Sequence, residues 1–235
     1  RSRGLGDVYK RQGFSQVPME ALGGAEEMAI RFRNVNTPKE ALEVERILEG
    51  RSPPILCVVG RKNAGKTTLT VSLAGELNRR GYRVMTVKSG HGFQVDRAGK
   101  DSWRHRHEGG AIRSVLSGPR DFAVVGRWPE ERMSLREVVR RFLFDADIVL
   151  AEGAKSSSEP RVEVFRRGMH AQPLLLNPGE EGTDPEAGSA PTLALVTDDP
   201  GLDVPVPTFS LDDPGSLSAL ADLVVETLLP SESRK

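Results

Sequence analysis

This chain of 235 residues lacks several features that would restrict its function. Its single cysteine, Cys57, excludes an internal disulfide and fits a reducing cytoplasm. Basic and acidic residues balance at 33 each, so no excess positive charge points to nucleic acid. No apolar stretch approaches the length that crosses a bilayer, so we expect no membrane segment. The length suffices for one buried α/β domain with short extensions.

A glycine-rich motif is the most informative feature of the sequence. Residues 60–68 read GRKNAGKTT and directly follow the apolar run 55–59. This arrangement predicts a buried strand, a phosphate-binding loop and a helix. Gly60 and Gly65 let successive backbone N–H groups turn into one hollow of anion size, and the helix adds its positive end. We therefore predict a nucleoside triphosphate site and disfavour the alternative, a glycine-rich turn with a chance Lys-Thr pair.

Each polar side chain of the motif has an expected role. Lys66 reaches the β- and γ-phosphates, which makes it a catalytic candidate, and the Thr67 hydroxyl binds magnesium. Glu152 follows the apolar run 148–151, where such a site needs a second magnesium ligand; the alternative is a solvated surface glutamate. Asp145 lies before that strand, at the wrong end. The predicted nucleotide-binding residues are Gly60, Arg61, Lys62, Asn63, Ala64, Gly65, Lys66, Thr67 and Thr68.

The polar segment 88–102 follows a predicted core strand, and ligands gather where parallel strands end. Asp96 is the second catalytic candidate, because it could serve the metal or an attacking water. Asp101 could serve the same purpose. The residues predicted to hold an anionic second ligand are Lys88, His91, Lys100 and Asp101. The alternative is a solvated loop in which Asp101 caps a short helix.

Two aspartates, Asp198 and Asp199, follow a late predicted strand. A carboxylate there could accept hydrogen bonds from guanine. However, the sequence contains no N-K-x-D motif, and a turn built from aspartate and proline is the favoured interpretation. Guanine preference therefore does not follow from these residues alone.

Strands and helices alternate from residue 55 onward. This pattern predicts the α/β class, as a three-layer P-loop NTPase fold with a mostly parallel sheet. The predicted strands cover residues 55–59, 82–87, 112–116, 122–125, 148–151, 162–165, 192–196 and 206–209. The predicted helices cover residues 66–80, 101–108, 135–144 and 214–229.

The chain divides into five predicted parts. Residues 1–12 include the string DVYKRQ, which matches a translated sequencing-library adapter, so we exclude them from fold reasoning. Residues 13–50 predict a strand at 30–36 and a helix at 37–48, too little to fold alone. A linker at 51–54 leads to the P-loop domain at 55–229, which contains a flexible loop at 177–191, and a tail at 230–235 follows.

Four segments, GRKNAGKTTL, TVKSGHGFQVDRAGKDS, IVLAEGAK and PRVEVFR, together resemble the molybdopterin-guanine dinucleotide biosynthesis protein B (MobB) family. The resemblance covers about residues 55–225. It implies a cytoplasmic homodimer that binds GTP and Mg²⁺, hydrolyses GTP weakly, and assists the guanylyltransferase that loads GMP onto molybdopterin. Ser89 and Gly92 depart from the family's histidine cluster, which leaves only His91.

The segment FRNVNTPKEALEVERIL, residues 32–48, resembles the C-terminal end of that guanylyltransferase, MobA. This second resemblance implies a truncated MobA–MobB fusion, with residues 13–50 as the remnant of the transferase domain. Two other functions stay open at this point. One is a P-loop kinase that phosphorylates a small metabolite bound at residues 88–102. The other is a nucleotide-gated scaffold that does not hydrolyse its nucleotide.

Overall fold

The computed structural model of the chain describes residues 52–90, 92–93, 95–128, 131–176, 190–199 and 201–229. The chain divides into two units, Arg1–Ser52 and Pro53–Lys235, and the elements below belong to the second. Several predictions fall outside the described residues: the segment 1–12, the strand at 30–36, the helix at 37–48, the role of His91, most of the loop at 177–191 and the tail at 230–235.

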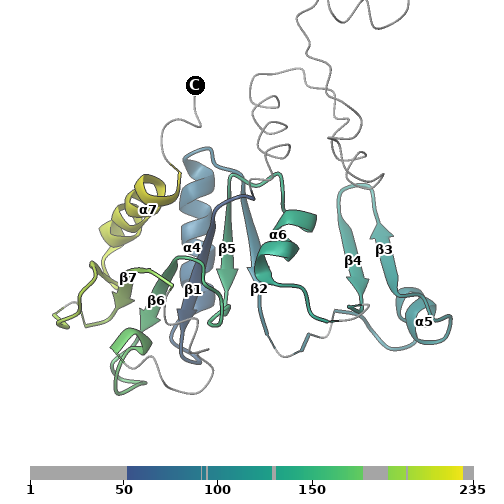
Figure 1. Cartoon of the computed structure of the whole chain (residues 1–235), viewed down its shortest axis with the longest axis horizontal. Helices are drawn as coiled ribbons and strands as arrows, with labels where there is room; N and C mark the ends of the chain where they lie inside the picture. The colour runs from purple at the N-terminus through teal and green to yellow at the C-terminus, as the bar shows by residue number, and fades with distance from the viewer. Residues whose placement is uncertain are drawn as a thin grey trace, which may run out of the picture. The chain divides into compact units, whose positions relative to one another are not determined.

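A six-stranded parallel sheet forms the centre of the second unit (Figure 1). The predicted α/β class and the mostly parallel sheet are therefore confirmed. Strand β1 is buried along its whole length and pairs with β5 on one side and β6 on the other. The strand order is β2 (Val84–Lys88), β5 (Ile148–Glu152), β1 (Ile55–Gly60), β6 (Arg161–Phe165), β7 (Thr192–Thr197) and β8 (Thr208–Ser210).

Helices cover both faces of this sheet. Successive side chains of a strand point to opposite faces, so an apolar strand such as β1 offers apolar side chains to helices on both sides. On one face, Leu56 and Val58 of β1 pack with Leu73 of helix α4 (Lys66–Arg79) and Val224 of helix α7 (Pro214–Leu228). On the other face, the alternate β1 residues pack with Val139 of helix α6 (Leu135–Phe142). The result is the predicted three-layer arrangement.

The helix ends follow local sequence signals. Ser134 caps α6 through a capping box with Glu137, in which each side chain bonds the other residue's backbone N–H. Asp213 accepts a hydrogen bond from the Gly215 N–H at the start of α7, where Pro214 is the first helical residue. Gly81, the second residue after α4, adopts φ 89°, a conformation that glycine takes without strain.

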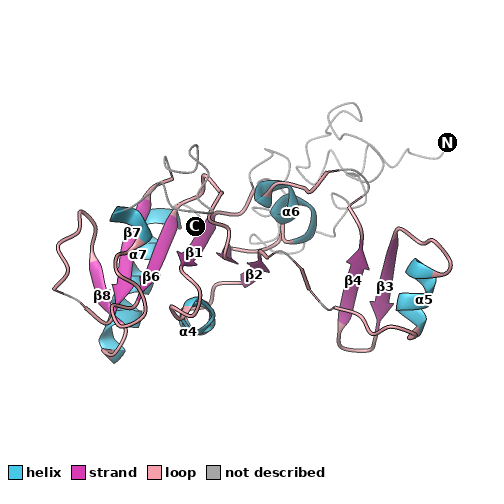
Figure 2. Cartoon of the chain, turned by 90° about the horizontal axis from the view of Figure 1, so that it is seen from below, coloured by secondary structure: helices cyan, strands magenta, loops and turns pink. Residues whose placement is uncertain are grey.

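A second, two-stranded sheet lies beside helix α5 (Figure 2). Strands β3 (Arg113–Ser117) and β4 (Phe122–Gly126) form an antiparallel hairpin, and α5 (Asp101–His107) packs on β3. The two strands predicted here are thus correct, and they do not join the large sheet. Among the described residues, no helix is both long and apolar enough to cross a bilayer.

Candidate nucleotide-binding site

The loop between β1 and α4 is the predicted phosphate-binding loop, and its backbone needs both glycines. Gly60 has φ 142° and Gly65, the residue before α4, has φ 107°. The Lys66 ammonium donates a hydrogen bond to the Arg61 carbonyl oxygen at 2.6 Å, so the side chain folds back over the loop. A backbone of this shape, followed by a helix start, is suited to hold phosphate groups.

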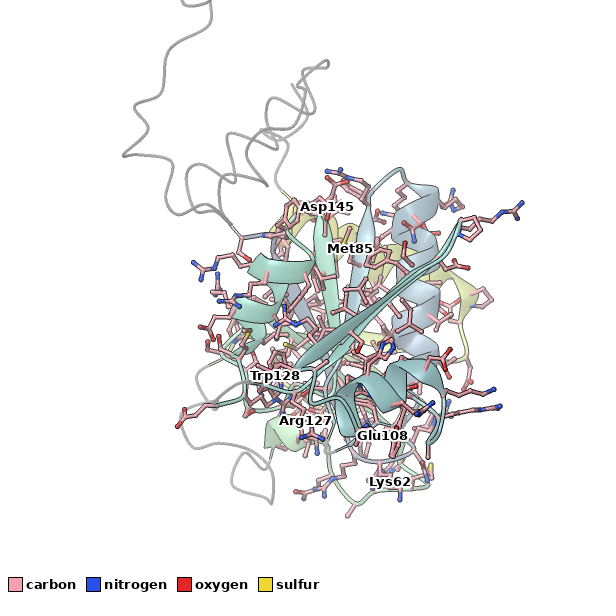
Figure 3. All side chains as sticks on the ribbon, turned by 90° about the vertical axis from the view of Figure 1, so that its right-hand side faces the viewer. Lys62, Met85, Glu108, Arg127, Trp128 and Asp145 are labelled. Atoms are coloured by element: carbon pink, nitrogen blue, oxygen red, sulfur yellow. The ribbon has the colours of Figure 1, made fainter. Side chains whose placement is uncertain are left out.

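Thr67 and Glu152 meet at the edge of this loop. The Thr67 hydroxyl donates a hydrogen bond to Glu152 Oε1 at 2.8 Å. Glu152 is the last residue of β5, which lies next to β1, so the sheet brings the two side chains together. Asp145, by contrast, lies at the end of the sheet away from Lys62 of the loop (Figure 3).

The oxygens of Thr67 and Glu152 fit a magnesium ion that arrives with a nucleotide. Mg²⁺ prefers oxygen ligands, and it binds through one or two protein groups plus substrate phosphates. Within the described part of the chain, no group of three or more histidine, cysteine or acidic side chains forms a metal cage. The nucleotide's own phosphates would complete the coordination of the metal.

Lys88 contacts the same carboxylate. Its ammonium donates to Glu152 Oε1 at 2.7 Å, although 58% of the Lys88 side chain is exposed against 12% for Glu152. Burial raises the pKa of the Glu152 carboxyl, but the hydrogen bonds from Lys88 and Thr67 outweigh it and leave the pKa below its ordinary value. Glu152 is therefore ionised at neutral pH, as a metal ligand must be.

Positive charge gathers around Glu152. Burial lowers the pKa of Lys66, the nearby charges of Lys155 and Lys88 lower it further, and Glu152 opposes them. Lys88 contacts Glu152, Lys66 lies close enough to lower its pKa, and Lys155 acts on Lys66. A surplus of positive charge beside backbone N–H groups favours a polyanion such as a triphosphate.

Two side chains that the sequence did not single out hold the loop from outside. Arg166 Nε donates to the Ala64 carbonyl oxygen at 3.2 Å, and His170 Nε2 lies 3.0 Å from the Lys62 carbonyl oxygen. Both follow β6, the other neighbour of β1. Finding them requires the strand order, which periodicity along the sequence does not give.

Glu163 fixes the segment that carries His170. It is almost completely buried, and its carboxylate accepts the backbone N–H groups of Leu174 and Leu175 at 2.5 and 2.9 Å. These residues begin a short 3₁₀ turn, Leu174–Leu176. Burial raises the pKa of the Glu163 carboxyl, against the lowering effect of the two hydrogen bonds.

Asp96 serves the packing of α5 in this structure. Its two carboxylate oxygens accept hydrogen bonds from Arg106 at 2.8 Å, Ser102 at 3.0 Å and the Arg97 backbone N–H at 2.9 Å. The hydrogen bond from Arg106 lowers the pKa of the Asp96 carboxyl. The expected role of Asp96 in hydrolysis stays a prediction.

The predicted second-ligand residues lie apart from one another. Lys88 reaches Glu152, whereas Lys100 lines a hollow of about 480 Å³ with Asp96 and Arg97. Asp101 is the first residue of α5 and not its cap, because the cap position belongs to Lys100, which makes no capping bond. The interpretation of Asp101 as a helix cap was therefore wrong.

Asp198 and Asp199 bind Arg167 at the end of β7. Asp198 accepts the Arg167 backbone N–H at 2.9 Å, and Asp199 forms an ion pair with its guanidinium at 2.8 Å. Both carboxylates thus have protein partners in this structure.

Comparison with known protein families identifies the family of this chain. Residues 55–181, more than half of the chain, match the family described as molybdopterin guanine dinucleotide synthesis protein B. The chain belongs to the MobB family. The phosphate loop, Glu152 and Arg166 all lie inside the matched segment, which ends before β7.

Curated MobB relatives carry the name molybdopterin-guanine dinucleotide biosynthesis adapter protein, which assigns the family to molybdenum cofactor biosynthesis. The chain is 36% identical to the Haemophilus influenzae protein over 118 residues, which are 49% of this chain and 65% of the relative. It is 29% identical to the Escherichia coli protein over 176 residues, which are 74% of this chain and 92% of the relative.

The crystal structure of Bacillus subtilis MobB has a similar fold. The TM-score is 0.53 at 23% sequence identity, and the alignment covers 72% of this chain and 97% of the other. The likeness at this identity concerns the fold alone.

Proposed function

We propose that this chain binds GTP with Mg²⁺ and acts as an adapter in the synthesis of molybdopterin guanine dinucleotide. The carrying observation is the phosphate loop with Thr67 and Glu152 at its edge, joined through a 2.8 Å hydrogen bond. In this proposal Lys66 and the loop backbone hold the phosphates, and Thr67 and Glu152 hold the metal. The bound metal would neutralise charge on the phosphates.

The family name supports guanine over adenine, because the named product contains guanine. Binding titrations with GTP and ATP, each with and without Mg²⁺, test this choice. We expect GTP to bind at least tenfold more tightly than ATP, a difference of about 1.4 kcal/mol. Equal affinities would remove the guanine assignment and leave a general nucleotide site.

Weak hydrolysis is part of the proposal. A water oxygen bonds to the γ-phosphorus and its proton passes to solvent, the bond from that phosphorus to the bridging oxygen breaks, and GDP leaves with the electron pair as inorganic phosphate forms. We keep Asp96 as the candidate that orients the water. Asp96→Asn should then lower the hydrolysis rate more than the affinity for GTP, whereas an unchanged rate would restrict Asp96 to the packing of α5.

The proposed partner is a MobA-type guanylyltransferase, and molybdopterin is the proposed second ligand. Lys100 and Arg97 support an anionic ligand in the hollow beside α5. We assign the protein to the cytoplasm because its one thiol, Cys57, is free and buried, as in reducing compartments. Co-purification of a MobA-type protein with the chain, with GTP and without it, tests the partner.

We also propose that the chain forms a homodimer through the β3–β4 hairpin. The hairpin exposes large apolar side chains, including Phe122 at 78% and Val115 at 64%. Exposed apolar patches of this kind mark interaction sites. Phe122→Asp should yield a monomer by light scattering, and Val71→Asp, at an apolar position of α4 that is 66% exposed, is the control. A dimer that survives Phe122→Asp would move the interface elsewhere.

A further inference from the structure

One oxygen atom of the site accepts two hydrogen bonds. Glu152 Oε1 accepts the Lys88 ammonium at 2.7 Å and the Thr67 hydroxyl at 2.8 Å. Since this is the oxygen that faces Thr67, it is also the oxygen that a metal shared by Thr67 and Glu152 would use. The Lys88 ammonium therefore bonds the oxygen that a bound cation would need.

We propose that Lys88 is a built-in counter-ion, which balances Glu152 while the nucleotide site is empty and gives way to Mg²⁺ when the nucleotide arrives. The inference rests on the proposed magnesium nucleotide site. It changes the role of Lys88 from a group that holds a second ligand to a counter-ion of Glu152.

Burial explains why Glu152 needs a counter-ion. Its side chain is 12% exposed, and an ionised carboxylate that has lost most of its water requires a charged or hydrogen-bonding partner. Thr67 supplies only a neutral hydroxyl. Lys88 supplies the charge and also holds Glu152 toward Thr67, which keeps the two oxygens at the spacing seen here.

Exposure explains how Lys88 can leave. Its side chain is 58% exposed, so water can solvate the ammonium as soon as it separates from Glu152. Lysine is a compact charge on a flexible four-carbon stem, which reorients at little cost. A metal ion and an ammonium on one oxygen repel each other, so the two cations compete for Glu152.

The exchange needs no movement of the backbone. Lys88 is paired with Glu152 in the β2–β5 ladder, and the Ser89 N–H donates to the Glu152 carbonyl oxygen at 2.8 Å. Gly153 keeps this contact close, because a β-carbon there would lie 2.9 Å from the Ser89 carbonyl oxygen. Only the Lys88 side chain turns, and the phosphates of the arriving nucleotide are the anions to which it can turn.

A consequence is that metal and nucleotide favour each other's binding. Without nucleotide, a metal ion must expel Lys88 into water and so binds weakly. With nucleotide, the displaced ammonium gains a phosphate partner, which makes the exchange more favourable. Coupling of this kind is reciprocal, so the metal must raise the affinity for nucleotide by the same factor.

The test measures Mn²⁺ binding to the nucleotide-free protein by electron paramagnetic resonance. Lys88→Met keeps the stem and removes the charge, and Lys155→Met is the control, because Lys155 is a nearby charge without a bond to Glu152. We expect Lys88→Met to tighten Mn²⁺ binding about three- to tenfold, the effect of one partly exposed ion pair, and Lys155→Met to change it less than about twofold. No tightening, or equal tightening in both variants, overturns the proposal.

A second measurement separates this role from a structural one. GTP affinity is measured with Mn²⁺ and in EDTA, and the ratio gives the coupling. The coupling should shrink in Lys88→Met and stay near the parent value in Lys88→Arg, which keeps the charge. A lower melting temperature with unchanged Mn²⁺ affinity and coupling would make Lys88 structural. If neither the parent nor its variants bind GTP, the proposed function fails. The Mn²⁺ measurement on the nucleotide-free protein still decides the role of Lys88.

Discussion

Gly60 lies against the backbone of Val164 so closely that a β-carbon on Gly60 would come within 2.4 Å of the Val164 carbonyl oxygen. The contact joins the start of the phosphate loop to β6, and no rotamer can relieve it because the obstructing atom belongs to the backbone. Any other residue at position 60 would also have to adopt φ 142°, a backbone angle that L-residues rarely take.

Gly60→Ala should therefore destabilise the fold by about 1–3 kcal/mol or more, the usual range for overpacking, and weaken triphosphate binding. Urea unfolding measures the first effect. Gly75→Ala is the matched control, because Gly75 lies in α4 with no atom within 4 Å of the added carbon. That change should stabilise the helix by about 0.5–1 kcal/mol. A neutral Gly60→Ala would mean that β6 can move away from the loop.

Lys66→Ala should abolish tight triphosphate binding and leave the fold intact. The Lys66 ammonium contacts the loop carbonyl of Arg61 and not the core. One charged hydrogen bond contributes about 1.5–3 kcal/mol, so affinity should fall about 10- to 150-fold. Isothermal titration with GTP and Mg²⁺ measures the loss, and an unchanged circular dichroism melt is the control. Equal affinity of variant and parent would end the assignment of this loop.

Glu152→Gln should weaken the magnesium dependence of nucleotide binding more than the binding itself. The substitution keeps the shape of the side chain and removes the charge that a hard cation prefers. A magnesium titration at fixed GTP should shift to higher concentration by about tenfold, the scale of one lost ligand charge. An unaltered titration would transfer the metal role to another carboxylate, with Asp96 as the first candidate.

Glu163→Gln should destabilise the fold by about 1–3 kcal/mol, because one of the Leu174 and Leu175 N–H groups loses its acceptor. The pKa of Glu163 is raised by burial above its ordinary value of 4.5. The protonated carboxyl thus contributes stability that is present below pH 4.5 and is lost as pH rises through the folded-state pKa. The stability gap between parent and variant should therefore narrow with rising pH. A gap that widens would contradict the assigned direction.

Removal of residues 1–51 tests the predicted transferase remnant. If residues 30–48 belong to a different domain, the deletion should leave the melting temperature and the GTP affinity nearly unchanged. Differential scanning calorimetry of the full and shortened chains makes the comparison. A large loss of stability would show instead that these residues complete the nucleotide-binding fold, and the likeness to MobA would be accidental.

The sequence was sufficient for the α/β class and for the proximity of Thr67 to Glu152, whose roles at a metal stay predictions. The motif at residues 60–68 has fixed spacing, and Glu152 follows an apolar run. These local patterns were enough to select Thr67 and Glu152, which form a hydrogen bond of 2.8 Å in the structure. The strand bounds were also close, since apolar alternation and glycine mark them directly. Local signals of this kind need no knowledge of the strand order.

The contacts of Lys88, Arg166 and His170 could not be predicted from the sequence. Lys88 meets Glu152 because β2 and β5, 64 residues apart at this contact, are neighbours in the sheet. Arg166 and His170 meet the loop because β6 is the other neighbour of β1. Strand order arises from packing of the whole chain, so Arg166 and His170 looked like ordinary polar residues, and Lys88 was assigned to a second ligand and not to Glu152.

The bonds from Arg166 to Ala64 and from His170 to Lys62 also determine when the loop loses its conformational entropy. A free loop would become ordered only on meeting the nucleotide, and each ordered residue would subtract from the affinity. Here the loop is already restrained by folding, so the nucleotide meets a preorganised surface. Arg166→Ala should then weaken GTP binding through a more unfavourable entropy, with little change in enthalpy, because Arg166 donates to the backbone of the loop.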